Sequence, residues 1–196
     1  MIRREKIRQN AIRAILIAII ILQDFVPFLG NIPIGPLSLT TLHVTVIVSA
    51  VVLGPVDGAI IGATWGILTW VRAFMAPSSP LAPLVMVNPL VSVLPRILIG
   101  FVAGYLYRWL SKITNGRLSM VIAAIAGSLT NTILVIGFIY LFYRTPAVAH
   151  AYGVNVDHLL IALGTIVATN GTCELILAAI ATPLISIPLL KIRPNK

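Results

Sequence analysis

Three ionisable side chains lie inside long apolar runs of this sequence, and they are Arg72, Arg96 and Glu174. A charged group at membrane depth is costly and usually serves a ligand or an ion. A guanidinium suits an acidic ligand, because its planar fork donates two parallel hydrogen bonds to a carboxylate. These residues therefore suggest a binding site for a small acid.

Arg96 is the strongest candidate for contact with a carboxylate. It directly follows Pro95, and the pair Asn88-Pro89 precedes it by about two helical turns. Prolines free backbone carbonyls and bend a helix, which a membrane protein tolerates where the chain lines a cavity. The alternative is a structural ion pair between Arg96 and Glu174. The sequence favours the ligand role.

Amide side chains lie in several of the same apolar runs. Asn170 and Glu174 are spaced i and i+4, so they share one helix face. Asn88 and Asn131 lie in two other runs. An amide in lipid needs a polar partner, and hydrogen bonding between helices would supply one for any single asparagine. Because these residues come from different runs, we predict that they share a cavity in the outer half of the protein.

Arg72 shares a predicted helix face with Trp65 and Thr69, because the spacing is i, i+4 and i+7. This spacing would place Trp65 as an apolar wall and Arg72 as a second cation of the cavity. The alternative is an arginine whose head extends to the membrane interface, and the sequence leaves both open. Thr41 is a weaker candidate for the ligand site. For the nearby His43, packing is the favoured interpretation.

The formal charge of these residues also predicts the ligand. Arg72 and Arg96 against Glu174 leave an excess of one positive charge. A desolvated, unpaired charge costs several kcal/mol, and a small monoanion would balance it. We therefore predict a monoanionic ligand.

Composition requires that membrane-spanning helices position these residues. The chain has 196 residues, of which 59% are hydrophobic and 10% are charged, and its mean hydropathy is +1.04. A soluble domain carries charge on roughly a quarter of its residues. The apolar runs are long and do not alternate as barrel strands do. We predict an all-α integral membrane protein with a single membrane domain over residues 1–196.

Six transmembrane helices are predicted from the apolar runs. The connector 27–36 is rich in proline and glycine, and 76–83 is too proline-dense for a regular helix. The predicted spans are Asn10–Val26, Ser38–Leu53, Val56–Met75, Asn88–Leu110, Leu118–Tyr143 and His158–Leu190.

Basic residues predict the orientation of the chain. They gather in the N-terminal segment 1–9, in one central loop and in the tail 191–196, whereas Arg144 stands alone in the opposite loops. Lys and Arg accumulate on the cytoplasmic side, so both termini are predicted to be cytoplasmic. Gln23-Asp24-Phe25 follows the first apolar run in place of a small-residue cleavage site, so the first helix is expected to be retained.

Several functional classes are disfavoured. Nucleic-acid binding is not expected, because the basic residues punctuate apolar runs and form no basic soluble module. Cys173 is the one cysteine, so we expect no disulfide within the monomer, no metal site and no cofactor. No Walker-type phosphate loop or catalytic triad pattern is present in the sequence, so an enzyme is not supported.

Small residues suggest where helices approach one another. Ala11, Ala14 and Ala18 lie in the first run, and Ala14 and Ala18 form an AxxxA spacing. Such spacing allows another helix to approach closely, either from a partner or within the protein. The ridge of Gly58, Gly62 and Gly66 is expected to serve internal packing.

Several segments together resemble the substrate-binding S-components of energy-coupling factor (ECF) vitamin transporters. The likeness covers almost the whole chain and is greatest to the pantothenate-specific type. The segments are the basic start leading into Ala14-xxx-Ala18, Gly54-Pro55-Val56-Asp57-Gly58-Ala59, Asn88-Pro89-Leu90-Val91-Ser92-Val93-Leu94-Pro95-Arg96, Gly127-Ser128-Leu129-Thr130-Asn131-Thr132 and Ala168-Thr169-Asn170-Gly171.

The resemblance implies a function. An S-component in a bacterial plasma membrane captures a vitamin from outside, docks on a membrane subunit called the T-component, and topples in the membrane to deliver its ligand, driven by two ATPase subunits. Ala11, Ala14 and Ala18 would form part of the docking face, and the connector would act as a lid. Arg96 would bind the carboxylate, while the amides and the acid would hydrogen-bond hydroxyl and amide groups; these are Asn88, Asn131, Asn170 and Glu174.

Three other readings stay open at this point. One is an S-component for folate, riboflavin or a pyridoxine-like vitamin, although a flat ligand would need more stacking aromatics than Trp65. Another is an autonomous secondary carrier that needs no ATPase. The third is a small membrane-embedded enzyme.

Overall fold

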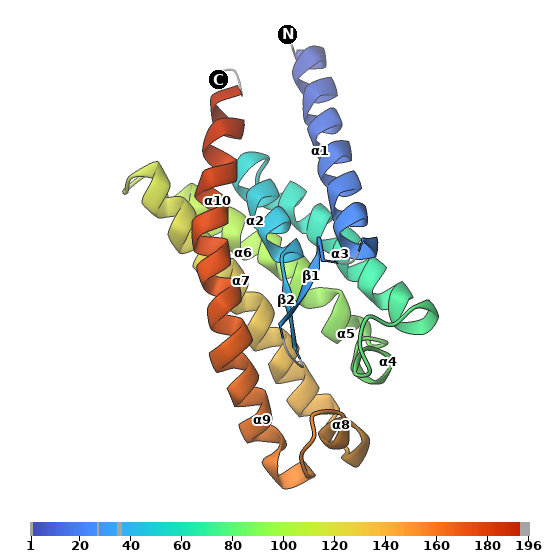
Figure 1. Ribbon diagram of the computed structural model, residues 1–196. Helices are drawn as coiled ribbons and strands as arrows, with labels where there is room; N and C mark the ends of the chain where they lie inside the picture. Colours follow the sequence, from blue (N-terminus) through green and yellow to red (C-terminus); the bar gives the residue numbers. More distant parts are fainter. Residues whose placement is uncertain (1, 27, 35–36, 193–196) are drawn as a thin grey trace.

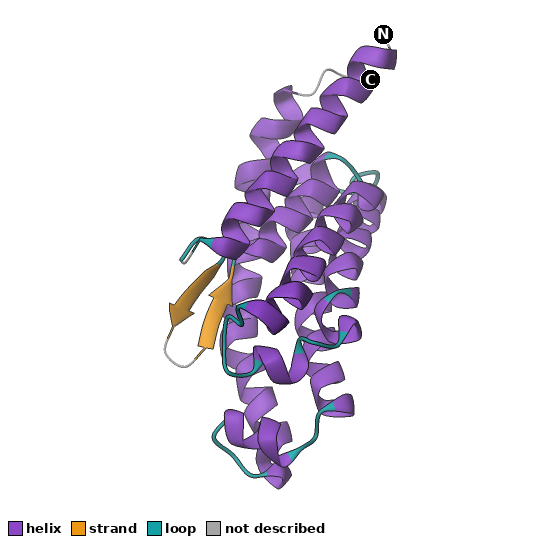
Figure 2. Cartoon of the chain, turned by 90° about the vertical axis from the view of Figure 1, so that its right-hand side faces the viewer, coloured by secondary structure: helices purple, strands orange, loops and turns teal. Residues whose placement is uncertain are grey.

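The computed structural model describes residues 2–26, 28–34 and 37–192. The chain folds into a bundle of helices with one two-stranded hairpin against its side (Figures 1 and 2). The prediction of an all-α protein is therefore wrong in this one element. Some residues that entered the predictions lie outside the described ranges, namely Pro27, Gly35 and Pro36 of the connector and Arg193 and Lys196 of the tail.

Helix α1 spans Ile2–Phe25 and begins eight residues before the predicted start of the first span. Residues 2–9 of the basic segment are thus continuous with the apolar helix, which fits the good helix propensity of Arg, Lys and Glu. One face of α1 packs on the bundle through Leu16 and Ile20, which are 7% and 0% exposed.

Part of the connector and the start of the predicted second span form an antiparallel hairpin, which corrects that span. Strands β1 (Asn31–Ile34) and β2 (Leu37–Thr40) pair in register, and helix α2 covers only Leu42–Val52. The alternating pattern Leu37-Ser38-Leu39-Thr40 favours a strand. At 1.5 Å per residue, α2 is about 16 Å long, which is short of the roughly 30 Å apolar core of a bilayer.

Helix α2 is nonetheless the centre of the bundle. Every residue of α2 except Thr45 is buried, and helices α1, α3, α6, α7 and α10 all contact it. Val46, Ile47 and Val48 form the middle of the larger hydrophobic core. Neighbouring helices rather than lipid therefore surround α2.

Helix α3 (Pro55–Met75) and helix α6 (Leu94–Leu110) form the tightest pair, and glycines on both make this contact. A side chain at Gly62 would collide with the backbone carbonyl of Arg96, and one at Gly100 would collide with the backbone of Gly58. The glycine ridge thus packs internally, as predicted. Gly54, which precedes α3, has φ +123°, a conformation that glycine adopts without strain.

The predicted fourth span is broken into two helices. A short helix α4 (Ala82–Val85) precedes it. Helix α5 (Pro89–Ser92) is then separated from α6 by Val93, which caps both helices. The break follows from Pro95, which has no N–H to continue the hydrogen bonding of α5. The fifth span matches its prediction within two residues as α7 (Gly116–Phe142).

The sixth predicted span is one long helical segment with an irregular middle. After α8 (Pro146–Ala151) and the 3-10 turn η1 (Val156–His158), it runs through α9 (Leu159–Ile166), the π-helical turn η2 (Val167–Gly171) and α10 (Thr172–Ile192). Isolated π turns frequently mark functional sites.

Four helical segments in the described ranges are long and apolar enough to cross a membrane. They are Pro55–Met75, Pro89–Leu110, Gly116–Phe142 and Val156–Lys191. Many large apolar side chains on these segments point outward, as expected where lipid covers the surface. The first residues of α1 and the last of α10 lie at the same end of the bundle (Figure 1).

The first prediction concerns the glycine contact between α3 and α6. Gly62→Ala should force α6 away from α3, because its Cβ would overlap the Arg96 carbonyl. Overpacking of this kind costs about 1–3 kcal/mol, so the melting temperature in detergent should fall. Gly137→Ala on α7 is the matched control, because a Cβ at Gly137 meets no atom within 4 Å. Equal melting temperatures for the two variants would contradict the packing described here.

Candidate functional site: a polar cavity between the helices and the hairpin

A cavity of about 270 Å³ lies between α3, α6, α7, η2 and the hairpin. This volume is close to the lower end of the range for small-molecule sites, about 300–1,000 Å³. One part of its wall is apolar and the rest carries charged and amide groups. The polar lining includes Asp24, Asn31, Thr40, Thr69, Arg72, Arg96, Asn131, Asn170 and Glu174, and the apolar lining includes Trp65, Leu81, Met86, Val135, Ile136 and Ile139.

The break between α5 and α6 orients Arg96. Residue 95 of a regular helix would donate its N–H to the carbonyl of Val91, but Pro95 has none. The Arg96 Nη1 takes that place and donates to the Val91 carbonyl over 2.7 Å. The proline thus creates the acceptor that fixes one edge of the guanidinium.

The remaining contacts of Arg96 leave it able to bind a ligand. Its guanidinium carbon lies 4.9 Å from the centre of the Trp65 ring, and its Nε has no hydrogen-bond partner although Arg96 is only 6% exposed. In the described part of the chain, ion pairs join Arg13 to Asp57 and Arg72 to Asp24. The alternative ion pair between Arg96 and Glu174 does not form.

Glu174 joins helix α10 to the hairpin. Its Oε1 accepts a hydrogen bond of 2.9 Å from the backbone N–H of Thr40, the last residue of β2. The backbone carbonyl of Glu174 lies 3.2 Å from Nε2 of His43, which is buried. Glu174 therefore holds the end of the hairpin beside the cavity, a role the sequence did not suggest.

Two of the predicted amides line the same cavity. Asn131 on α7 is 7% exposed, and its Oδ1 has no hydrogen-bond partner. Asn170 lies in the π turn η2, followed by Gly171, whose missing side chain leaves room for Thr132 of α7. The orphaned oxygen of Asn131 is a buried acceptor that a ligand donor would satisfy.

Arg72 is held by the end of α1. Its Nη1 lies 3.1 Å from Oδ2 of Asp24 and also donates to the Asp24 backbone carbonyl, and its guanidinium carbon lies 5.4 Å from the Phe25 ring. Arg72 also lines the cavity, so the interpretation of an arginine that only extends to the interface does not describe it.

Asp24 corrects the charge count made from the sequence. It is 7% exposed and lines the cavity, so the two arginines are matched by two acids instead of one. The predicted excess positive charge is therefore absent. The local distribution is what favours an anion near Arg96, because Arg72 is already paired with Asp24.

Two predicted ligand residues lie elsewhere in the structure. Asn88 caps α5, where its Oδ1 accepts a hydrogen bond of 2.9 Å from the N–H of Leu90. Thr41 closes the base of the hairpin through a hydrogen bond of 2.6 Å to the carbonyl of Leu29. Neither residue is among those lining the cavity.

The cavity also contains residues that sequence reasoning missed, and Asp24 and Tyr152 are the main ones. Tyr152 follows α8, outside the membrane-spanning segments, and burial raises the pKa of its phenol to about 12. The phenol therefore stays neutral at physiological pH and can both donate and accept a hydrogen bond. Asp24 lies at the end of the first apolar run, and its partner Arg72 comes from another helix, so no local pattern signalled its role.

The three alanines of α1 lie on the outside of the bundle. Ala11, Ala14 and Ala18 are all exposed, so they do not pack against other helices of the described structure. Internal packing, one of the two interpretations open from the sequence, does not account for them.

Comparison with known proteins gives consistent matches over the chain. The family model described as ECF transporter, substrate-specific component matches residues 8–186. The pantothenic acid transporter PanT of Lactococcus lactis is 34% identical over 98% of this chain and 99% of its own. The pantothenate transporter PanT of Leuconostoc mesenteroides is 34% identical over 67% of each chain.

A solved structure has the same fold. The crystal structure of the S-component for biotin from an ECF-type ABC transporter superposes with a TM-score of 0.64 over 100% of this chain and 96% of its own, at 16% identity. The chain is therefore a membrane protein that belongs to the family of substrate-specific components of ECF transporters.

Proposed function

We propose that this chain binds pantothenate as the substrate-specific component of an ECF importer. The observation that carries the proposal is the guanidinium of Arg96, which belongs to the lining of the cavity and whose buried Nε has no hydrogen-bond partner. A carboxylate would complete its hydrogen bonding. The two PanT transporters, similar over most or all of their length, support pantothenate as the acid.

The other walls of the cavity fit the rest of the pantothenate molecule. Pantothenate carries a carboxylate at one end, an amide in the middle, and two hydroxyls beside a dimethyl-substituted carbon. Asn131, Asn170 and Asp24 offer donors and acceptors for the polar groups, and Val135 and Ile136 offer an apolar wall for the methyls. Trp65 keeps the Arg96 guanidinium in place from one side.

The orientation in the membrane follows from the distribution of charge. In this proposal the chain crosses a bacterial plasma membrane six times, with both termini in the cytoplasm. Helix α1 adds to the four long apolar segments, and the short α2 makes the second crossing together with the hairpin that precedes it. The hairpin then lies on the outer side of α2 and covers the cavity as a lid, tied down by Glu174.

Transport in this proposal requires partners. The exposed alanine face of α1 docks on the T-component, and ATP hydrolysis by two ATPase subunits drives release of the vitamin into the cytoplasm. Small residues are typical of the contacts between membrane helices, because small side chains let two backbones approach closely.

Isothermal titration of the purified chain tests the vitamin assignment. We expect pantothenate to bind, and riboflavin, folate and pyridoxine to bind at least about 100-fold more weakly, since site polar groups left unpaired cost several kcal/mol. Vesicles that contain the chain alone should take up no pantothenate. Tighter binding of another vitamin would contradict pantothenate as the ligand. Uptake by the chain alone would indicate an autonomous carrier.

A further inference from the structure

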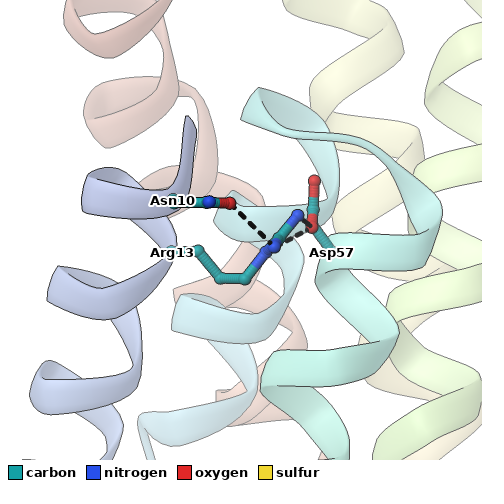
Figure 3. Close-up of polar contacts among 3 residues, drawn as sticks. All are labelled: Asn10, Arg13 and Asp57. Atoms are coloured by element: carbon teal, nitrogen blue, oxygen red, sulfur yellow. Dashed lines mark hydrogen bonds and ion pairs between the residues drawn. The ribbon is translucent and has the colours of Figure 1, made fainter. Parts of the chain in front are cut away.

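Two ion pairs join α1 to α3, one toward each end of the apolar part of α1. At the inner end, Arg13 Nε donates to Asp57 Oδ1 over 2.7 Å, and Arg13 Nη1 donates to Asn10 Oδ1 over 3.2 Å (Figure 3). At the outer end, Asp24 pairs with Arg72. Asp57 lies in the first turn of α3 and Arg72 in its last turn. The two helices therefore run parallel, fastened at both ends.

The paired residues of α1 lie on one face of that helix. Arg13 and Asp24 are eleven residues apart, which is about three turns of 3.6 residues. Leu16 and Ile20 lie between them on the same face and are buried against the bundle. The ion pairs thus mark the two ends of the face that α1 turns toward its neighbours.

Apolar contacts alone would not fix the rotation of α1 about its axis. The opposite side of α1 is also apolar, with Ile15 and Leu22 exposed at 59% and 57%. Lipid is as apolar as a helix interface, so burial of such residues gives little preference for one rotation. A rotated α1 would separate Arg13 from Asp57. The Asp57 carboxylate, whose side chain is 14% exposed, would then lose its partner, which is costly for a largely buried charge.

The rotation that the ion pairs hold determines where the alanines point. Ala14 directly follows Arg13, so it lies about 100° around the helix from the paired face. Ala14 and Ala18 are exposed as a result. Asp57 is absent from the lining of the cavity, as is Arg13, whereas both residues of the outer pair belong to it.

We propose that the Arg13–Asp57 ion pair positions α1 for docking, by holding the rotation and register that present Ala11, Ala14 and Ala18 to the T-component. This inference rests on the proposed function, since it concerns the docking step. Arg13 and Asp57 act through the position of α1, and neither of them lines the ligand cavity. The outer pair, Asp24 with Arg72, belongs to the ligand site instead.

Copurification tests this positioning role. The chain is coexpressed with a tagged T-component and the ATPase pair, and the amount recovered with the tag is measured for Arg13→Ala, Asp57→Ala and the charge-swapped double variant Arg13→Asp with Asp57→Arg. Arg8→Ala is the matched control, because it removes a basic residue from α1 that makes no described ion pair. Titration of each isolated variant with pantothenate reports whether its cavity is intact.

We expect the amount of each single variant recovered with the tag to fall about tenfold, and its pantothenate affinity to stay within about threefold of that of the wild type. The charge-swapped variant should recover most of the docking, and Arg8→Ala should dock normally. Single variants that dock like the wild type would overturn the inference, as would a charge-swapped variant that binds pantothenate but does not dock.

The remaining outcomes are also decisive. If the single variants do not fold, the charge-swapped variant tests the inference: docking by this variant supports it, and a folded variant that does not dock overturns it. Parallel losses of docking and pantothenate binding would indicate a general structural role and overturn the positioning role. If the wild type docks but binds no pantothenate, the vitamin assignment fails while the docking comparison still stands. A wild-type chain that does not dock overturns the inference itself.

Discussion

Replacing Arg96 with glutamine is expected to abolish pantothenate binding while leaving a folded protein. Glutamine keeps a hydrogen-bonding group but loses the charge and the planar fork that a carboxylate needs. Removing one partner of a buried, hydrogen-bonded charge pair costs about 2–5 kcal/mol, which is a loss of at least about 30-fold in affinity. Titration calorimetry with pantothenate measures this loss directly.

Arg144→Gln is the control for Arg96→Gln, because it makes the same chemical change in an exposed residue that lies over the Tyr140 ring and away from the cavity. It should bind as the wild type does. The melting temperature of Arg96→Gln should remain close to that of the wild type, since the change removes a hydrogen bond to one backbone carbonyl and a contact with the Trp65 ring but no ion pair. An unchanged affinity in Arg96→Gln would rule out Arg96 as the carboxylate site.

Ala14→Trp should separate ligand binding from transport. Ala14 is exposed on α1 and absent from the cavity lining, so a tryptophan there meets lipid in the isolated chain and leaves pantothenate affinity unchanged. In the assembled transporter the indole would occupy the space of the partner helix, because close contact between membrane helices depends on small residues. We expect the rate of ATP-dependent uptake by reconstituted vesicles to fall at least about tenfold, as a loss of ~1.4 kcal/mol in the free energy of docking would produce.

The control for Ala14→Trp is Ile133→Trp on α7, which adds the same side chain at another outward-facing apolar position, 60% exposed. Uptake by this variant should stay near that of the wild type. Normal uptake by Ala14→Trp would refute the docking role of the α1 alanines, whereas loss of pantothenate binding in that variant would mean that α1 rather than the interface had been disturbed.

Prolines and glycines made much of the fold predictable from the sequence. The bend at Pro95 and the glycine ridge of α3 follow from backbone chemistry, since a missing N–H or a missing side chain has the same consequence in any context. The ends of α3 and α7 agree with their predicted bounds within two residues. These features depend on few neighbours, and local sequence therefore specifies them.

The hairpin was missed because its strands are short and merge into an apolar run. Four residues at Leu37–Thr40 alternate in polarity, but the apolar sequence of α2 follows almost at once. The strand and the helix together are about as long as a membrane span, so hydropathy alone predicted one helix in place of the two elements. The strand is defined by its pairing with β1, in which Thr40 lies opposite Asn31, and hydropathy does not report such pairing.

For some candidate site residues, the neighbouring sequence alone could have given the correct role. Asn88 directly precedes Pro89, and asparagine before a proline at the first helical position is typical of a helix cap. The role of Asp24 could not be read locally, because its partner Arg72 comes from another helix. Its pairing also changes which arginine is available to a ligand.

Native mass spectrometry of the purified chain tests the central claim most directly, because it identifies a bound small molecule by mass without assuming what that molecule is. After incubation with a mixture of vitamins, the wild type should carry one molecule with the mass of pantothenate, and Arg96→Gln should carry none. A wild type that retains a different vitamin, or an Arg96→Gln variant that retains pantothenate as well as the wild type does, would contradict the account.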